Sequence, residues 1–121
     1  MKTIVWVTPE YFIETDIYIV PELAKFFKIN WIIEHVNSRE QVPFYSDVKK
    51  LEKVPNLYIE YIIRPKGHPL SLKFWGYYWS FISKIKSYKP DAIYSAILGI
   101  PYVPFCVMRL SRKKIVFAAH N

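Results

Sequence analysis

Hydrophobic positions fall into short continuous runs, separated by longer segments in which polar residues recur at helical spacing. The runs are rich in β-branched and aromatic residues, which favours strands over helices. They predict five strands, at 3–8, 31–36, 57–63, 91–95 and 115–119. Continuous apolar strands, clearest in the first and fifth, are typical of a parallel sheet that is covered by helices on both faces.

The segments between the runs predict four helices, at 17–28, 46–53, 71–88 and 100–110. Asp16 is expected to cap the first helix, which Pro21 either kinks or begins. Its inner face is expected to carry Leu23, Phe26 and Phe27. The third helix has a polar stripe at helical spacing, made of Lys73, Gly76, Ser80, Lys84 and Ser87.

This alternation of strands and helices predicts an α/β fold with a doubly wound, Rossmann-like parallel sheet of five strands. Right-handed crossovers favour the strand order 3-2-1-4-5, with the switch point between the first and fourth strands. A fifth strand of this kind needs a following helix. We therefore expect residues 1–121 to be the N-terminal domain of a longer protein.

Composition is consistent with one globular domain of 121 residues, of which 52% are hydrophobic. The net charge of +7 favours anionic partners. A single cysteine, Cys106, excludes an internal disulfide and suits a reducing compartment. The N-terminus lacks a signal-peptide pattern, and no apolar run approaches the ~18 residues of a spanning helix. We expect a cytoplasmic protein, with peripheral contact to the inner face of the membrane as an open alternative.

Three common site chemistries are excluded by the sequence. It has neither the GxGxxG pattern of dinucleotide binding nor a GxxxxGK[ST] phosphate loop. Its three histidines and one cysteine do not cluster at metal-ligand spacing. We therefore expect no cofactor and no metal.

The candidate binding residues follow from the position of ligands in open parallel sheets, which bind beyond the carboxyl ends of the strands. Beside the switch point, this rule selects Thr8, Glu10, Ser95, His120 and Asn121. We expect Thr8, Glu10, Ser95 and His120 to converge as a substrate-binding site, and no catalytic residue is assigned. The rule also selects the ends of the second and third strands, at 36–37 and 64–68. Of the other histidines, His35 lies within a strand and is expected to be structural, and His68 is expected to be solvated.

Four stretches resemble the N-terminal half of a GT-B glycosyltransferase of the family 4 type. They are TIVWVTPEY at 3–11, PELAKFF at 21–27, KPDAIYSA at 89–96 and KKIVFAAHN at 113–121, in the family's order and at suitable spacing. The resemblance implies a retaining enzyme that transfers a sugar from a nucleotide-sugar donor to a glycan or lipid-linked acceptor. This half would hold the acceptor, with the donor-binding domain downstream and His120 contacting ligand at the cleft between them.

The sequence departs from the family pattern in two places. Residues 13–16 replace the Gly-Gly turn that follows the first strand, and Ala96 replaces the second histidine of the fourth-strand pattern. The family's paired glutamates belong to its C-terminal half.

Two other interpretations remain open. The third predicted helix is expected to pack on the sheet with its lysines toward solvent, but it is apolar around more of its circumference than one sheet contact requires. The remaining apolar surface would face an anionic membrane, a lipid-linked acceptor or a further domain. The docking residues would be Trp75, Tyr78, Trp79, Lys73 and Lys84. Alternatively, the whole chain is a basic binding module for nucleic acid or an anionic surface. Nucleic acid is disfavoured because the basic residues are scattered rather than arranged in a stripe.

Overall fold

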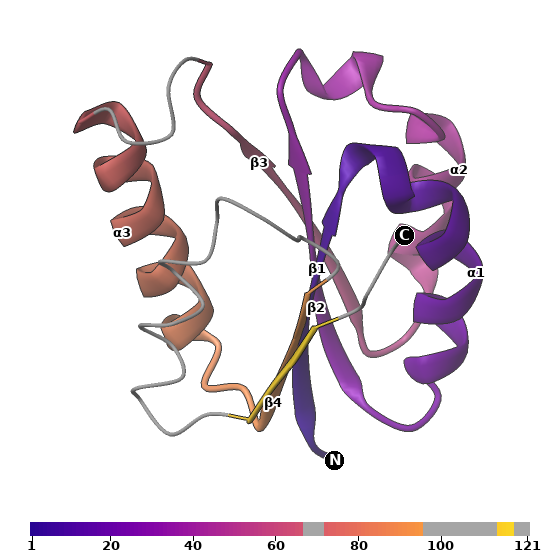
Figure 1. Cartoon of the computed structure of the whole chain (residues 1–121). Helices are drawn as coiled ribbons and strands as arrows, with labels where there is room; N and C mark the ends of the chain where they lie inside the picture. The colour runs from indigo at the N-terminus through magenta and orange to yellow at the C-terminus, as the bar shows by residue number, and fades with distance from the viewer. Residues whose placement is uncertain (67–71, 96–113, 118–121) are drawn as a thin grey trace.

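A parallel sheet with the strand order β3-β2-β1-β4-β5 forms the centre of the protein, as the sequence predicts (Figure 1). The computed structural model describes residues 1–66, 72–95 and 114–117, the last four by backbone only. The strands are β1 (Thr3–Pro9), β2 (Lys28–His35), β3 (Leu57–Ile63), β4 (Ala92–Ser95) and β5 (Lys114–Phe117). All four strand pairings are parallel.

Helices cover both faces of this sheet. Helices α1 (Ile13–Leu23) and α2 (Tyr45–Lys50) lie on one face, and α3 (Leu72–Ser87) lies on the other (Figure 1). Short 3-10 helices complete the connections: η1 (Glu10–Phe12), η2 (Arg39–Gln41) and η3 (Leu51–Lys53). The predicted helix at 100–110 lies outside the described residues, as do Cys106, His68, His120 and Asn121.

The first helix differs from its prediction. It begins at Ile13 rather than Ile17, because η1 turns the chain directly after Pro9. Asp16 therefore lies inside α1 and does not cap it; its carboxylate points into the protein and accepts buried hydrogen bonds. Phe26 was expected on the inner face but is 70% exposed, because α1 ends at Leu23. Pro21 lies in the last turn of the helix.

The second strand is longer than predicted at its start. It begins at Lys28 rather than Trp31, since Lys28, Ile29 and Asn30 pair in register with Thr3, Ile4 and Val5 of β1. It ends at His35, one residue before the predicted end.

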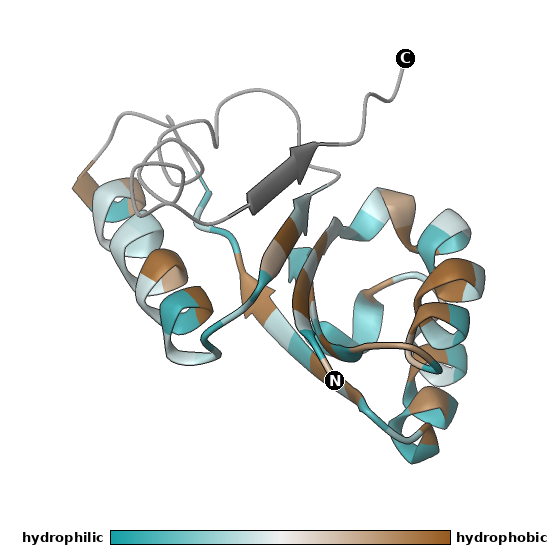
Figure 2. Ribbon diagram, turned by 90° about the horizontal axis from the view of Figure 1, so that it is seen from below, coloured by the Kyte–Doolittle hydropathy of each residue, from teal (hydrophilic) through white to brown (hydrophobic). Residues whose placement is uncertain are grey.

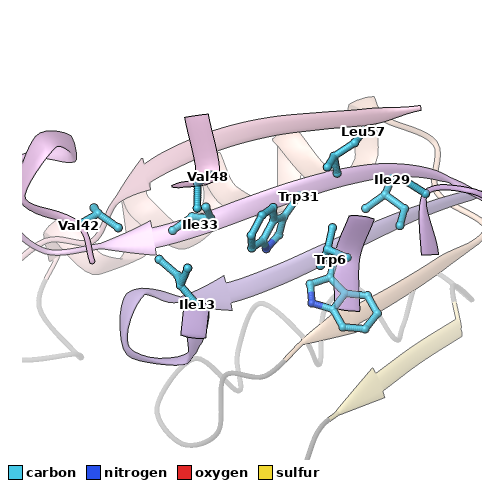
Figure 3. Close-up of a cluster of buried hydrophobic side chains, with 10 residues drawn as sticks. Trp6, Ile13, Ile29, Trp31, Ile33, Val42, Val48 and Leu57 are labelled. Carbon is cyan, nitrogen blue, oxygen red and sulfur yellow. The ribbon is translucent and has the colours of Figure 1, made fainter. Parts of the chain in front are cut away.

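Strand alternation divides the core into two clusters. Trp6 and Trp31 lie on the face covered by α1 and α2, with Ile13, Ile29, Ile33, Val42, Val48 and Leu57 (Figure 3). Val5, Val7, Ile32 and Ile93 lie on the opposite face, where Phe81, Ile82 and Ile85 of α3 pack against them. Figure 2 shows the corresponding hydrophobic stripes on helices at both sides of the sheet.

Candidate functional site

The carboxyl ends of β1, β2 and β4 meet at one edge of the sheet, and buried polar side chains lie there on both faces. On the α1 face, Thr8 donates a hydrogen bond of 2.6 Å from its hydroxyl to Asp16 Oδ2. The same hydroxyl accepts a 2.9 Å hydrogen bond from Trp31 Nε1, and Trp6 Nε1 donates to Asp16 Oδ2 at 3.2 Å. Thr8 is fully buried and Asp16 is 2% exposed. The polar groups of these four side chains therefore form their hydrogen bonds with one another inside the core.

Ser95 occupies the opposite face from Thr8. Trp6 of β1 stacks on Tyr94 of β4 at a centroid distance of 3.7 Å, which places Tyr94 on the α1 face. Ser95 is the next residue and is paired with Val7, so it lies on the α3 face. The expectation that Thr8 and Ser95 converge is therefore wrong, because one residue of offset between paired strands reverses the face.

On the α3 face, Glu34 forms the centre of a second polar group. It lies at the carboxyl end of β2, is 5% exposed, and accepts a hydrogen bond from the hydroxyl of Tyr77 in α3. Arg64 follows β3 directly, and its backbone N–H donates to the carbonyl of His35 at 2.7 Å. The guanidinium of Arg64 lies 5.7 Å from the centre of the Phe74 ring.

Electrostatic effects link this group to the candidate Glu10. Burial raises the pKa of Glu34, and the Tyr77 hydrogen bond and the Arg64 charge offset part of that rise. The charge of Glu10, half-buried directly after β1, raises it further. Burial beside Glu34 also raises the pKa of Tyr77, which keeps its hydroxyl a hydrogen-bond donor. Glu10, Glu34, Arg64 and Tyr77, called the α3-side group below, therefore combine two carboxyls, a cation and a phenol at the edge where ligands bind.

Tyr78 adds an unsatisfied hydroxyl on the same side. Its side chain is 5% exposed, and within the described part of the chain its buried hydroxyl has no hydrogen-bond partner. Burial raises its pKa, and the charge of Arg64 lowers it partly. Tyr78 was included in the alternative of a docking surface on this helix; the structure places it in the interior, where it shares the inner side of α3 with Phe74 and Phe81.

His35 has the structural role that the sequence predicts. It is 2% exposed, and its Nδ1 donates to the carbonyl oxygen of Asn37 at 2.6 Å. Its ring also meets the edge of Tyr61 at a centroid distance of 5.8 Å. The ring therefore fixes the turn that follows β2.

Glu34 and Tyr77 are not among the site residues that the sequence predicts. Glu34 lies inside an apolar strand, and the signal that identifies it is a carboxylate two residues before the predicted strand end at Val36. Arg64 was included only as the first residue of the loop after β3. Among residues 1–66, 72–95 and 114–117, no three metal-ligating side chains gather at one point.

A shallow cavity of about 290 Å³ lies on the sheet away from this edge. It is lined by Asn30, Ile32, Tyr58, Glu60 and Tyr88, among others. Glu60 there accepts hydrogen bonds from Lys84, at 2.7 Å, and from Tyr88. These contacts join α3 and its C-terminal turn to β3.

Comparisons with known structures identify the same architecture elsewhere. A glycosyltransferase from Rickettsia africae matches with a TM-score of 0.62 and 18% identity, over 96% of this chain and 29% of that one. Two structures of the C-terminal domain of a hydrogenase from Pyrococcus furiosus match with TM-scores of 0.67 and 0.68, both at 10% identity. They cover 98% and 97% of this chain, and 92% and 91% of theirs. The sequence matches no family model and no curated protein.

These likenesses establish the fold, a Rossmann-like parallel α/β domain similar in structure to part of a glycosyltransferase and to a hydrogenase C-terminal domain. This chain spans less than a third of the matched glycosyltransferase. Within the described ranges, no helix has both the length and the apolar character needed to cross a membrane.

Proposed function

We propose that this domain is the acceptor-side, N-terminal half of a GT-B glycosyltransferase. The full protein would transfer a sugar from a nucleotide-sugar donor to a glycan or lipid-linked acceptor. A donor-binding domain would follow Asn121 in the full reading frame.

The observation that carries this proposal is that a resemblance in sequence and a match in backbone structure both point to a glycosyltransferase. Four stretches of sequence, distributed from residue 3 to residue 121, resemble the family in the right order. Separately, the backbone matches a glycosyltransferase over 96% of this chain. The hydrogenase domain matches the backbone with higher TM-scores, 0.67 and 0.68 against 0.62, so the proposal depends on the sequence stretches to choose between the two.

The α3-side group supplies the chemistry that an acceptor site needs. Sugar hydroxyls are bound by carboxylates, which accept hydrogen bonds, and by cations and phenols, which donate them. Glu34 is held in place by Tyr77, and Arg64 presents a half-buried cation beside it. In the proposed enzyme these residues position the acceptor, together with Glu10, Ser95, His120 and Asn121, so that its nucleophilic hydroxyl faces the donor.

The test is a transfer assay on the protein expressed from its full reading frame, with a panel of nucleotide-sugars and membrane or glycan extracts as acceptors. We expect turnover with at least one donor and a loss of about a hundredfold in the His120→Ala variant, as for removal of a positioned polar group. His68→Ala is the matched control and should retain activity.

Two outcomes would count against the proposal. One is a reading frame without a second α/β unit after Asn121. The other is equal turnover by His120→Ala and wild type, which removes His120 from the site. Binding to nucleic acid that falls steeply between low and moderate salt would instead support the basic binding module.

A further inference from the structure

Helix α3 presents an apolar surface away from the sheet. Its buried side chains are Phe74, Tyr78, Phe81, Ile82 and Ile85. On the other side, Leu72, Trp75 and Trp79 are 89%, 51% and 76% exposed, at i, i+3 and i+7 of the helix. These three residues, which define the outer face of α3, therefore form one stripe along its exposed side.

Small residues surround this stripe, so neighbouring side chains of the helix do not cover the two indole rings. Gly76, Ser80 and Ser83 are all exposed and lie on the same side of the helix. A Cβ built on Gly76 would meet no atom within 4 Å. The two tryptophan rings are therefore accessible to a flat surface that approaches α3 from outside.

The charges around the outer face have one sign. Residues 72–87 contain no aspartate or glutamate. Lys73 and Lys86 are exposed beside the stripe, whereas Lys84 is bonded to Glu60 and is not available. An anionic surface would therefore meet lysines and no repelling carboxylate on this helix.

Helix α1 provides an internal comparison, because it also exposes large apolar side chains. Tyr18 is 76% and Ile19 is 40% exposed. Glu14 and Glu22 are exposed on the same helix, so its outward surface is acidic. Both helices therefore expose aromatic rings. Of these two helices, α3 alone has basic side chains that would attract a negatively charged surface.

We propose that the outer face of α3 docks this protein on the surface of an anionic phospholipid bilayer. Trp75 and Trp79 enter the headgroup region, where indole rings gain apolar contact while keeping their N–H in a polar layer. Lys73 and Lys86 pair with lipid phosphates. The inner side of α3 stays packed on the sheet, so the contact is peripheral. Lys73, Trp75 and Trp79 belong to the predicted docking set; Tyr78 and Lys84 do not contribute.

Charge complementarity favours an anionic bilayer over a symmetric contact with a second copy of this chain. A second copy docked through the same face would bring another basic helix against the first, and the lysines would repel each other. The proposal does not depend on glycosyltransferase activity, since membrane binding is measured without substrate.

The experiment is co-sedimentation of the full-length protein with vesicles of phosphatidylcholine alone and of phosphatidylcholine with about one-third phosphatidylglycerol. We expect binding to the anionic vesicles and at least a tenfold weaker affinity for the Trp75→Ala/Trp79→Ala variant. Lys73→Gln and Lys86→Gln should each weaken binding about fivefold, as expected for one basic residue at an anionic surface. All four side chains are exposed, so these variants should fold.

The matched control is Tyr18→Ala/Phe26→Ala, which removes two exposed rings from the opposite face of the molecule. It should bind the anionic vesicles like wild type. Equal binding by the two double variants overturns the proposal, as does equal affinity for neutral and anionic vesicles, or no binding to either. A concentration-dependent dimer that the Trp75→Ala/Trp79→Ala change abolishes would assign the outer face to a second copy instead.

Discussion

Thr8 shows how a residue at a ligand-binding edge can be committed to the core. Its hydroxyl donates to Asp16 and accepts from Trp31, so both of its hydrogen-bonding functions are used inside the protein. A polar residue at the end of a strand therefore identifies the right edge of the sheet without identifying which residues face a ligand. The sequence places Thr8 correctly at this edge but does not reveal the partners, which come from α1 and β2.

Replacing this hydroxyl should destabilise the fold. Thr8→Val keeps the shape of the side chain but removes one hydrogen-bond partner from Asp16 and one from Trp31. Leaving such groups unsatisfied costs about 1–3 kcal/mol each. Because two groups are affected, we expect the free energy of unfolding, measured by urea denaturation, to fall by about 2–6 kcal/mol. Thr15→Val, on the exposed side of α1, is the control and should change stability by no more than about 0.5 kcal/mol.

Glu34 should make stability depend on pH. Burial raises the pKa of its carboxyl, so its favourable contribution is complete below the ordinary carboxyl pKa and is lost as pH rises through the raised value. Glu34→Gln keeps an acceptor for Tyr77 but does not ionise. The free energy of unfolding of wild type, relative to this variant, should therefore fall as pH rises from the ordinary carboxyl pKa through the raised folded value.

Denaturation curves at a series of pH values provide the measurement. Glu14→Gln removes an exposed carboxylate of α1 and reports the effect of net charge alone. If the free energy of unfolding depended on pH in the same way for wild type and Glu34→Gln, burial would not be raising the pKa of the Glu34 carboxyl.

At the scale of elements, α3 is attached to the edge strand β3 by polar contacts as well as by its apolar side. Glu60 accepts from Lys84 and Tyr88. Burial opposes ionisation of Glu60, but these two hydrogen bonds outweigh it, and the pKa of its carboxyl is lowered. Burial raises the pKa of Tyr88 to about 12, and its hydrogen bond to Glu60 and the charge of that carboxylate add to the rise.

Breaking this attachment should have a small effect that depends on pH. Glu60→Gln is expected to lower the free energy of unfolding by no more than about 1 kcal/mol at pH 7, since Glu60 and Lys84 are both about one-third exposed. Because the folded pKa is lowered, the difference should decrease as pH falls below the ordinary carboxyl pKa and vanish once pH is below the lowered folded value. Glu22→Gln breaks the more exposed pair with Lys25 and should have almost no effect; an equal loss in both variants would contradict this role of Glu60.

The elements themselves were largely predictable, because each depends on local pattern. The bounds of β3 were predicted without error, and those of α3 and β4 agree within one residue over the described part. The errors arise where tertiary contacts decide the conformation. Asp16 resembles a helix cap in sequence, but the buried donors of Trp6 and Thr8 bind its carboxylate.

At the scale of the whole molecule, the strand order followed from the handedness of crossovers and was confirmed. The residues that make up the candidate site could not be predicted from the sequence in the same way, because they depend on the face of the sheet to which each strand residue points. Thr8 and Ser95 were assigned to one site by their positions at strand ends, yet the register of β1 and β4 separates them across the sheet. The α3-side group joins residues that lie up to 67 positions apart, from Glu10 to Tyr77, and no local pattern connects them.

The four tryptophans of the chain form two pairs whose fluorescence should respond differently to a quencher. Trp6 and Trp31 are 8% and 0% exposed within the hydrogen-bonded core, while Trp75 and Trp79 are largely open to solvent on the other side of the sheet. A dissolved quencher such as iodide will therefore reach the emission of the α3 pair and leave the core pair shielded. The protein thus carries its own label-free probes, one pair reporting on folding and the other on whatever contacts the outer face of α3.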